Sequence, residues 1–294
     1  MITCNLMGGL GNQLFQIFTT IACALDNNLK FTFLYNRMVG KRPTYWDNFM
    51  LPLKRYTTIS IPPSKLLREK AFHYEPISRA NFLQKMDITL YGYFQSFKYF
   101  KVHVEHIADF ALNLSDCQKR VLTMEFVDKA LVLDKAHGAT DKALDMDTTI
   151  SMHFRMGDYR AIQDCHPIMP HTYYRNSLLK INKHNDSWSV LYFCEDMDVP
   201  VVNEYIAFLK KEFPGLQFVR ANPQLSDWEQ MVLMTCCKHH IIANSTFSWW
   251  GAYLDFAKDK IVCYPSLWFG PKLAHNNTKD LFPDDGCWFK IAIA

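Results

Sequence analysis

The sequence predicts an α/β protein of two Rossmann-like, doubly wound domains that face a central cleft. Short apolar runs of strand length alternate with longer helical patterns, and this alternation builds parallel sheets from βαβ units. The alternation begins afresh in each half of the chain, and 294 residues correspond to about two domains at ~150 residues each. A polar stretch at residues 137–148 separates the halves, so we expect domains at residues 1–147 and 148–294.

The second half shows the pattern most clearly. Three helices are expected there: Val199–Phe213 stops at a Pro-Gly pair, Ser226–Cys237 begins with a Ser-Asp capping pair, and Thr246–Lys258 follows Asn-Ser. Five apolar runs are typical of strands, at residues 148–154, 189–194, 216–220, 239–243 and 260–264. Strands that alternate with helices in this way predict a parallel sheet.

The first half opens in the same manner and then loses its pattern. Ile2–Leu6 and Phe31–Tyr35 are typical of strands, and Asn12–Leu25 is a helix that is apolar nearly all round and therefore buried. Five prolines interrupt residues 36–88, where we expect no regular elements. Helical periodicity returns at Tyr99–Leu112 and Cys117–Lys129.

Composition excludes several classes of protein. With 49% hydrophobic and 21% charged residues, the chain is neither disordered nor a disulfide miniprotein. The net charge of +3 divides into +4 for residues 1–147 (18 basic, 14 acidic) and −1 for the rest (14 basic, 15 acidic). No stripe of Lys and Arg stands out, so we expect no nucleic-acid partner. For the small basic excess we favour an ordinary solvated surface over contact with an anionic substrate or a peripheral contact with a membrane.

Cysteine usage and the N-terminus bear on the compartment. The nine cysteines are odd in number and form no C-x-x-C pair, and the histidines form no H-E-x-x-H, which favours a reducing compartment and no metal site. The N-terminus lacks the charged region of a signal peptide, and Leu14–Leu25 is too short to span a bilayer. We therefore expect a cytoplasmic protein without a transmembrane segment.

Ligands of such sheets bind at the carboxyl ends of the strands. After the first strand, Gly9-x-Gly11 imitates a dinucleotide motif, but Leu14 replaces the third glycine. The next strand ends without the acid that would hold a ribose, which disfavours NAD. Gly11, Asn12 and Gln13 would then bring backbone amides and a helix start to a ligand, and a simple packing turn is the alternative.

Two further strand ends carry charge. His153 closes the strand at 148–154, and Arg155, at its mouth, has the forked geometry that suits a diphosphate. Asp158 follows within the same turn, and a surface Arg–Asp pair is the alternative. Glu195 and Asp196 follow the next strand, where acids hold a ribose or the N–H edge of a base, or cap the following helix.

The strand at 239–243 is followed by hydroxyl side chains and then a helix. Such a helix start, with its N–H groups and dipole, favours an anion, and N-capping alone is the alternative. The Trp249-Trp250 pair that follows is compatible with a place in the core. The residues expected to contact the anion are Asn244, Ser245, Thr246, Phe247 and Ser248.

Together these stretches resemble the α-1,2-fucosyltransferase family. Residues 8–16 (GGLGNQLFQ) look like its N-terminal motif, residues 153–159 (HFRMGDY) like its H-x-R-R-G-D-Y motif, and residues 244–252 (NSTFSWWGA) like its C-terminal motif. Residues 92–100 (GYFQSFKYF) resemble a further segment, in which the family usually has an acid at the place of Phe97. The resemblance spans residues 8–252 in the family's order.

The resemblance implies a GT-B fold, GDP-fucose as co-substrate, inversion at the sugar, and a reaction with no metal or other cofactor. It places the donor mainly in the second domain and the acceptor glycan, with a terminal β-galactoside, on the side of the first. Arg155 matches the arginine associated with the donor phosphates, and His153 and the pair Glu195-Asp196 match positions near the nucleotide. Met156 stands where the family commonly has a second Arg, which removes one positive charge and puts donor affinity or turnover in question.

The implied mechanism assigns two catalytic residues. Arg155 would meet the charge that develops on the departing diphosphate, and Asp158 is the first choice for the base, before Asp164 and Glu195. Alternatives are a GT-B transferase for another nucleotide sugar, a non-catalytic sugar-nucleotide or glycan-binding relative, and a Rossmann oxidoreductase. Six aromatic residues of the first half could stack on sugar rings or belong to the core: Tyr45, Trp46, Tyr56, Tyr74, Tyr91 and Tyr93.

Overall fold

The structure is a computed structural model that describes residues 1–82, 86–133, 144–182 and 188–293. The chain forms two compact units: unit 1 comprises Met1–Ser115 and Asn276–Pro283, and unit 2 comprises Asp116–His275 and Asp284–Ala294. Most of the polar stretch expected to separate the domains, residues 137–143, lies outside the described residues. The α/β class with parallel sheets is confirmed in each unit.

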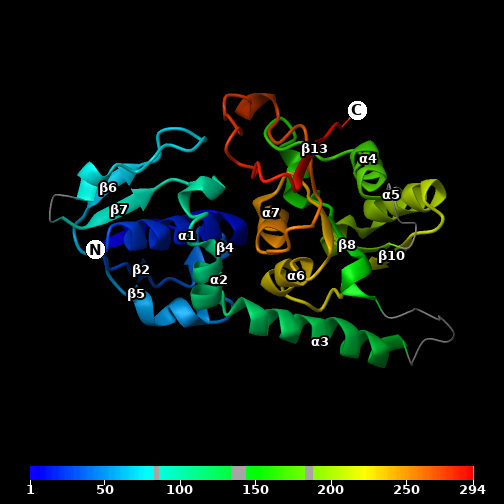
Figure 1. Cartoon of the computed structure of the whole chain (residues 1–294), viewed down its shortest axis with the longest axis horizontal. Helices are drawn as coiled ribbons and strands as arrows, with labels where there is room; N and C mark the ends of the chain where they lie inside the picture. Colours follow the sequence, from blue (N-terminus) through cyan, green and yellow to red (C-terminus); the bar gives the residue numbers. More distant parts are fainter. Residues whose placement is uncertain (83–85, 134–143, 183–187, 294) are drawn as a thin grey trace. The chain divides into compact units, whose positions relative to one another are not determined.

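Unit 2 contains a six-stranded parallel sheet in the order β10-β9-β8-β11-β12-β13. In chain order this is 3-2-1-4-5-6, the doubly wound arrangement that binds ligands where the strand order reverses. Helices α4 and α5 cover one face of the sheet, and α6 and α7 cover the other (Figure 1). The strands are β8 Thr149–His153, β9 Ser189–Phe193, β10 Gln217–Arg220, β11 His239–Ile241, β12 Val262–Pro265 and β13 Trp288–Ile291.

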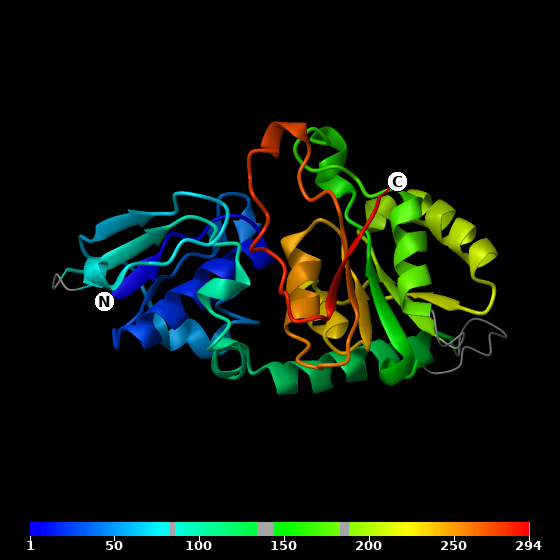
Figure 2. The ribbon, with the colours of Figure 1, turned by 45° about the horizontal axis from the view of Figure 1, so that its top comes forward.

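The helices of unit 2 pack on strands that are buried on both faces. Ile150 and Met152 of β8 are fully buried against Tyr173 and Leu178 of α4, which is why these strands show up in the sequence as continuous apolar runs. At the edge of the sheet, the red strand β13 runs beside the orange β12 (Figure 2). The helices are α3 Leu114–Leu133, α4 His171–Ile181, α5 Val199–Glu212, α6 Asp227–Met234 and α7 Thr246–Tyr253.

Unit 1 is built on the three-stranded parallel sheet β1-β7-β6, extended from β1 by a single bridge between Ile2 and Phe31 towards the parallel pair β2-β5. As expected, α1 is buried almost all round, with 14 of its 17 residues buried. The elements are β1 Ile2–Cys4, α1 Leu10–Asp26, β2 Phe33–Leu34, β3 Met38–Val39, β4 Arg42–Pro43, β5 Thr57–Thr58, β6 Lys65–Arg68, β7 Ile88–Tyr91 and α2 Val104–Leu112, with the 3-10 helix η1 at Leu51–Tyr56.

Several expectations about elements were wrong. Residues 36–88 contain short strands and 3-10 helices rather than none, because strands of two residues are too short to show a period. The helices expected at Tyr99–Leu112 and Cys117–Lys129 are confirmed as α2 and α3 with shifted bounds, whereas helix α4 and strand β13 were not predicted. Helix α7 ends at Tyr253 instead of Lys258, because the carboxylate of Asp255 accepts the N–H of Ala257 and turns the chain.

The units divide at Ser115/Asp116 rather than at the expected 147/148, because α3 packs with unit 2. Arg120 of α3 forms an ion pair with Glu229 at 2.8 Å, and the buried carboxylate of Glu125 accepts the N–H of Asn222 at 2.8 Å. A segment near the C-terminus, Asn276–Pro283, also belongs to unit 1 although the residues on either side of it belong to unit 2. Asp280 belongs to unit 1, where its carboxylate lies 2.6 Å from the ammonium of Lys98.

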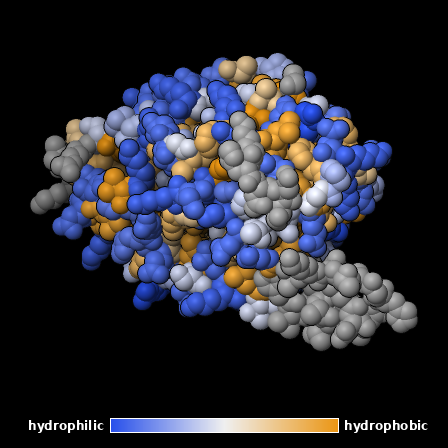
Figure 3. All heavy atoms as spheres, turned by 45° about the vertical axis from the view of Figure 1, so that its right-hand side comes forward, coloured by the Kyte–Doolittle hydropathy of each residue, from blue (hydrophilic) through white to orange (hydrophobic). Residues whose placement is uncertain are grey.

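No helix within the described ranges is both long and apolar enough to cross a bilayer. On the face seen in Figure 3, hydrophilic and hydrophobic residues are interspersed.

Candidate active site

The reversal of strand order in unit 2 lies between β8 and β11, which pair with each other directly. Residues 155–161 follow β8, and residues 244–248 follow β11, so both segments leave the sheet at its carboxyl edge. The hydroxyl of Tyr159 donates a hydrogen bond to the carbonyl of Asn244 at 3.1 Å and joins the two segments. The motifs of residues 153–159 and 244–252 therefore meet where a doubly wound sheet binds its ligand.

Arg155 is the centre of a charge cluster at the end of β8. Its Nη1 donates to Glu195 Oε1, and its Nη2 donates to Asp158 Oδ1 at 2.5 Å. Its Cζ also lies 5.2 Å from the centroid of the Tyr159 ring. The structure thus brings together three of the predicted residues, Arg155, Asp158 and Glu195, and it also realises the Arg–Asp pair that was the alternative interpretation.

Gly157 makes room for this cluster. A Cβ on Gly157 would stand 2.6 Å from Glu195 Oε2, closer than real side chains approach. Glycine at this position therefore allows the Glu195 carboxylate to reach the guanidinium of Arg155.

The turn that carries Arg155 and Asp158 is held by Asp198, the residue just before the expected helix Val199–Phe213. The Asp198 side chain is 0% exposed; it accepts the Gly157 N–H at 2.8 Å and pairs with Arg160 at 2.7 Å. The sequence signal for it is weak, because an acid at a helix start is usually a cap. Asp198 is a positioning residue that holds η5 (Gly157–Ala161) in place.

At the start of α7, the polar side chains serve mainly to cap and brace the helix. Ser245 Oγ accepts the N–H of Phe247, which confirms the N-capping interpretation for this residue. The amide of Asn244 donates to the carbonyls of Pro167 and Trp268. Ser248 is buried, and Thr246 and Phe247 are half-buried. Trp249 and Trp250 lie in the core, which confirms the place that the sequence allowed for them.

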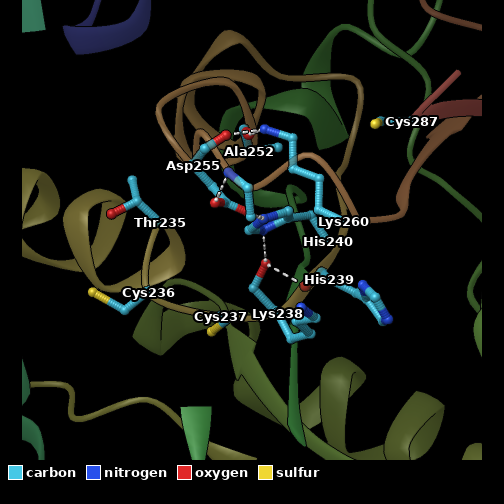
Figure 4. Close-up of polar contacts among 12 residues, drawn as sticks. Thr235, Cys236, Cys237, Lys238, His239, His240, Ala252, Asp255, Lys260 and Cys287 are labelled. Atoms are coloured by element: carbon cyan, nitrogen blue, oxygen red, sulfur yellow. Dashed lines mark hydrogen bonds and ion pairs between the residues drawn. The ribbon is translucent and has the colours of Figure 1, made fainter. Parts of the chain in front are cut away.

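A buried polar network supports the other end of α7 (Figure 4). The Lys260 ammonium donates to the carbonyl of Ala252 at 2.8 Å, near the C-terminus of the helix, where a cation is favoured by the helix dipole. Asp255 Oδ2 lies 2.9 Å from His240 Nε2, and His240 Nδ1 lies 2.8 Å from Ser151 Oγ of β8. The network ties α7 to β11 and β8, the two strands that carry the candidate site.

His153 lies beside the same edge in a neutral state. Its side chain is buried, its ring centroid lies 5.4 Å from that of Phe247, and its Nδ1 has no hydrogen-bond partner among the described residues. Burial, together with the nearby Arg155 cation, lowers the pKa of His153 to about 3. An unpaired buried nitrogen at a ligand-binding edge is available to a ligand.

This burial gives a testable pH dependence of stability. The pKa of His153 is lowered to about 3 and that of His239 to about 4, in both cases mainly by burial, whereas an unfolded chain titrates near ~6.5. Between the folded and the unfolded pKa, each histidine binds a proton only in the unfolded chain. The free energy of unfolding is therefore highest above about pH 6.5 and decreases as the pH falls, by up to about 1.4 kcal/mol per pH unit for each histidine.

Urea denaturation at about pH 7 and about pH 5 measures this slope. The variant His239→Gln should show a shallower loss than the unmodified chain, because one of the two groups no longer titrates. Equal free energies of unfolding at both pH values in the unmodified chain would contradict the prediction.

Asp196 does not join the cluster at Arg155. Its exposed carboxylate pairs instead with Arg220 Nη2 at 2.5 Å. The two consecutive acids thus separate, Glu195 towards β8 and Asp196 towards β10.

The predicted donor residues of the first half lie in unit 1 and have local partners there. Gln13 donates to the carbonyls of Gly8 at 3.0 Å and Pro43 at 2.8 Å, and Asn12 Oδ1 accepts from Gln95 at 2.9 Å. Gly11 is buried within α1. These contacts agree with the alternative of a simple packing turn. The contact of Gly11, Asn12 and Gln13 with a donor stays a prediction.

The aromatic residues of unit 1 divide between core and surface. Tyr45 and Trp46 are buried in the core, whereas Tyr91 and Tyr93 are exposed. Tyr91 carries the guanidinium of Arg68 over its ring at 4.5 Å. The last two residues, Tyr56 and Tyr74, pack against Phe31 and Tyr99, respectively.

Two curated relatives and a solved structure are similar to this chain. An O-antigen biosynthesis glycosyltransferase, WbnK, of Escherichia coli is 26% identical over 99% of this chain and 100% of its own length. An α-1,2-colitosyltransferase of Escherichia coli is 26% identical over 92% of each chain. Among solved structures, a FUT1 mutant of Arabidopsis thaliana in complex with GDP is 11% identical, with a TM-score of 0.48 over 96% of this chain and 74% of that one.

The family description "Glycosyl transferase family 11" matches residues 1–268, which include every motif that meets at the candidate site. The chain therefore belongs to glycosyl transferase family 11.

Proposed function

We propose that this glycosyltransferase moves L-fucose from GDP-β-L-fucose to O2 of a terminal β-galactoside on an acceptor glycan, with inversion to an α-1,2 linkage. One observation carries the proposal: Arg155 and the start of α7 stand together at the strand-order reversal of unit 2. A guanidinium fork beside a helix N-terminus favours a diphosphate. The name of the α-1,2-colitosyltransferase relative supports the linkage.

In this reaction the acceptor oxygen bonds to C1 of fucose, and the bond from C1 to the diphosphate oxygen breaks. The electron pair of the broken bond goes to the diphosphate, whose growing negative charge is stabilised by Arg155 and by the dipole of α7. Preorganised groups of this kind contribute about 3–4 kcal/mol each to lowering the barrier. The proposed reaction uses no metal ion and no cofactor beyond the GDP-sugar.

We assign the base to Asp158, which takes the proton of the acceptor hydroxyl. Its carboxylate is half exposed and is held by Arg155, so it can be reached from solvent while its position is fixed. Asp164 is a poorer choice, because it pairs with Lys272 at 3.1 Å on the surface. Glu195 already holds the other nitrogen of Arg155.

A second donor sugar is favoured by one of the relatives. The α-1,2-colitosyltransferase acts with colitose, so a GDP-linked deoxy sugar other than fucose is the main alternative for this chain. Competition between GDP-fucose and GDP-colitose in one transfer assay distinguishes the two donors.

Two measurements test the proposal. Calorimetry with GDP, UDP and ADP should show binding of GDP well above the other two, and tighter binding of UDP or ADP would overturn the choice of donor. A glycan array incubated with labelled GDP-fucose, followed by linkage analysis, should show α-1,2-fucosylated galactosides. Binding of GDP-fucose with neither transfer nor hydrolysis would instead identify a non-catalytic binding protein.

A further inference from the structure

We propose that Glu195 competes with the donor diphosphate for Arg155, and that this competition makes the site reject diphosphates that lack a nucleoside. The inference rests on the proposed function in one respect, namely that Arg155 binds the donor diphosphate. Glu195 then has a role in specificity in addition to its expected contact with the nucleotide.

The cluster at Arg155 carries an excess of negative charge before a donor binds. Without a donor, the terminal nitrogens of the Arg155 guanidinium are bonded to two carboxylates, those of Glu195 and Asp158. Two negative charges around one positive charge leave a local excess of one negative charge. A diphosphate that approaches this cluster meets like charge, which costs free energy unless one carboxylate leaves.

Glu195, rather than Asp158, is the carboxylate that leaves Arg155. Asp158 lies three residues from Arg155 in the turn whose backbone is held by buried Asp198, so it stays near the guanidinium. Glu195 comes from the end of a different strand, β9, and although the two carboxylates are similarly exposed, at 46% for Glu195 and 48% for Asp158, the side chain of Glu195 has one more rotatable bond. Glu195 can therefore rotate away from Arg155 without any change in the backbone.

The displaced carboxylate of Glu195 finds a new partner only when the ligand has a nucleoside. Glu195 stands at the end of the strand next to β8, the place where an acid in a doubly wound sheet holds a ribose. A nucleoside offers ribose hydroxyls and base N–H groups that replace the hydrogen bond lost to Arg155. Inorganic pyrophosphate offers none, so its binding leaves the cost of the displacement uncompensated.

The variant Glu195→Gln tests the proposal directly. Glutamine has nearly the same shape and removes the negative charge, so inorganic pyrophosphate should bind at least about ten-fold more tightly in magnesium-free calorimetry. The affinity for GDP should rise less, because the variant also lacks the charged acceptor that Glu195 offers to the nucleoside. The ratio of GDP affinity to pyrophosphate affinity should therefore fall. The double variant Arg155→Ala/Glu195→Gln should lose the gain.

Glu212→Gln is the matched control. Glu212 forms an ion pair with Arg175 at 2.8 Å, with both side chains about as exposed as Glu195, and it lies in helix α5. This variant should leave both affinities unchanged. Thermal unfolding of each variant establishes that the proteins compared are folded.

The outcomes separate this inference from the proposed function. Unchanged or weaker pyrophosphate binding in Glu195→Gln overturns the inference, even where GDP binds normally and fucose is transferred. Tighter pyrophosphate binding that depends on Arg155, in a chain that binds no GDP, supports the competition at Arg155 and overturns the nucleotide-sugar function.

Discussion

Replacement of Arg155 by alanine is expected to lower kcat/KM for transfer from GDP-fucose by about 10³-fold or more. Removal of one preorganised hydrogen-bond donor to a developing anion lowers the rate by about 10²–10³-fold, and this variant also loses a positive charge. Arg155 is the cation at the end of β8 and is bonded to Glu195 and Asp158. Arg155→Lys should recover little activity, because an ammonium keeps the charge but loses the two parallel hydrogen bonds of the fork.

The measurement is the initial rate of transfer of labelled fucose by purified enzyme. Arg175→Ala is the control, because Arg175 also pairs with a carboxylate in unit 2, that of Glu212, and is not part of the candidate site. Near-normal turnover by folded Arg155→Ala would remove Arg155 from the mechanism, and the proposed role of Glu195 with it.

Replacement of Asp198 by alanine is expected to lower the free energy of unfolding by about 2–3 kcal/mol, because it leaves a buried N–H without an acceptor. That N–H belongs to Gly157, and Asp198 is 0% exposed between Gly157 and Arg160. Arg160 is 43% exposed and can return to water, so the loss stays below that of a fully buried ion pair. The turn that carries Arg155 should loosen at the same time, and GDP affinity should fall.

Urea denaturation followed by tryptophan fluorescence measures the change. Asp196→Ala is the matched control, two residues earlier in the chain, where an exposed carboxylate pairs with Arg220. An exposed pair of this kind contributes less than about 1 kcal/mol. Equal unfolding midpoints for the two variants would show that burial of Asp198 does not stabilise the turn.

Five of the six strands in the sheet of unit 2 were predictable, because they are buried on both faces. Residues such as Ile150, Val190 and Ile241 make each strand a short apolar run, and the helices between them carry caps and stops. In unit 1 the strands β3 to β5 are only two residues long, so no period of two can be seen in them. Their pairing depends on neighbours distant in sequence, as when Phe33 pairs with Thr57.

The division into units was not predictable from the pattern of the chain. The periodicity that predicts helix α3 does not say on which unit the helix packs, and only its contacts with residues about a hundred positions away, such as that of Arg120 with Glu229, assign it to unit 2. The return of Asp280 to Lys98 in unit 1 depends likewise on long-range contact.

The sequence by itself determined the family motifs, the α/β class and the place of Arg155 at the carboxyl end of a buried strand, because these follow from local order and apolar periodicity. Only the tertiary structure decided that Glu195 reaches Arg155 while Asp196 turns to Arg220, and that Asp198 is buried beneath the turn. The physical reason is that consecutive side chains at a strand end point in different directions, and what each one meets depends on which strands lie beside it.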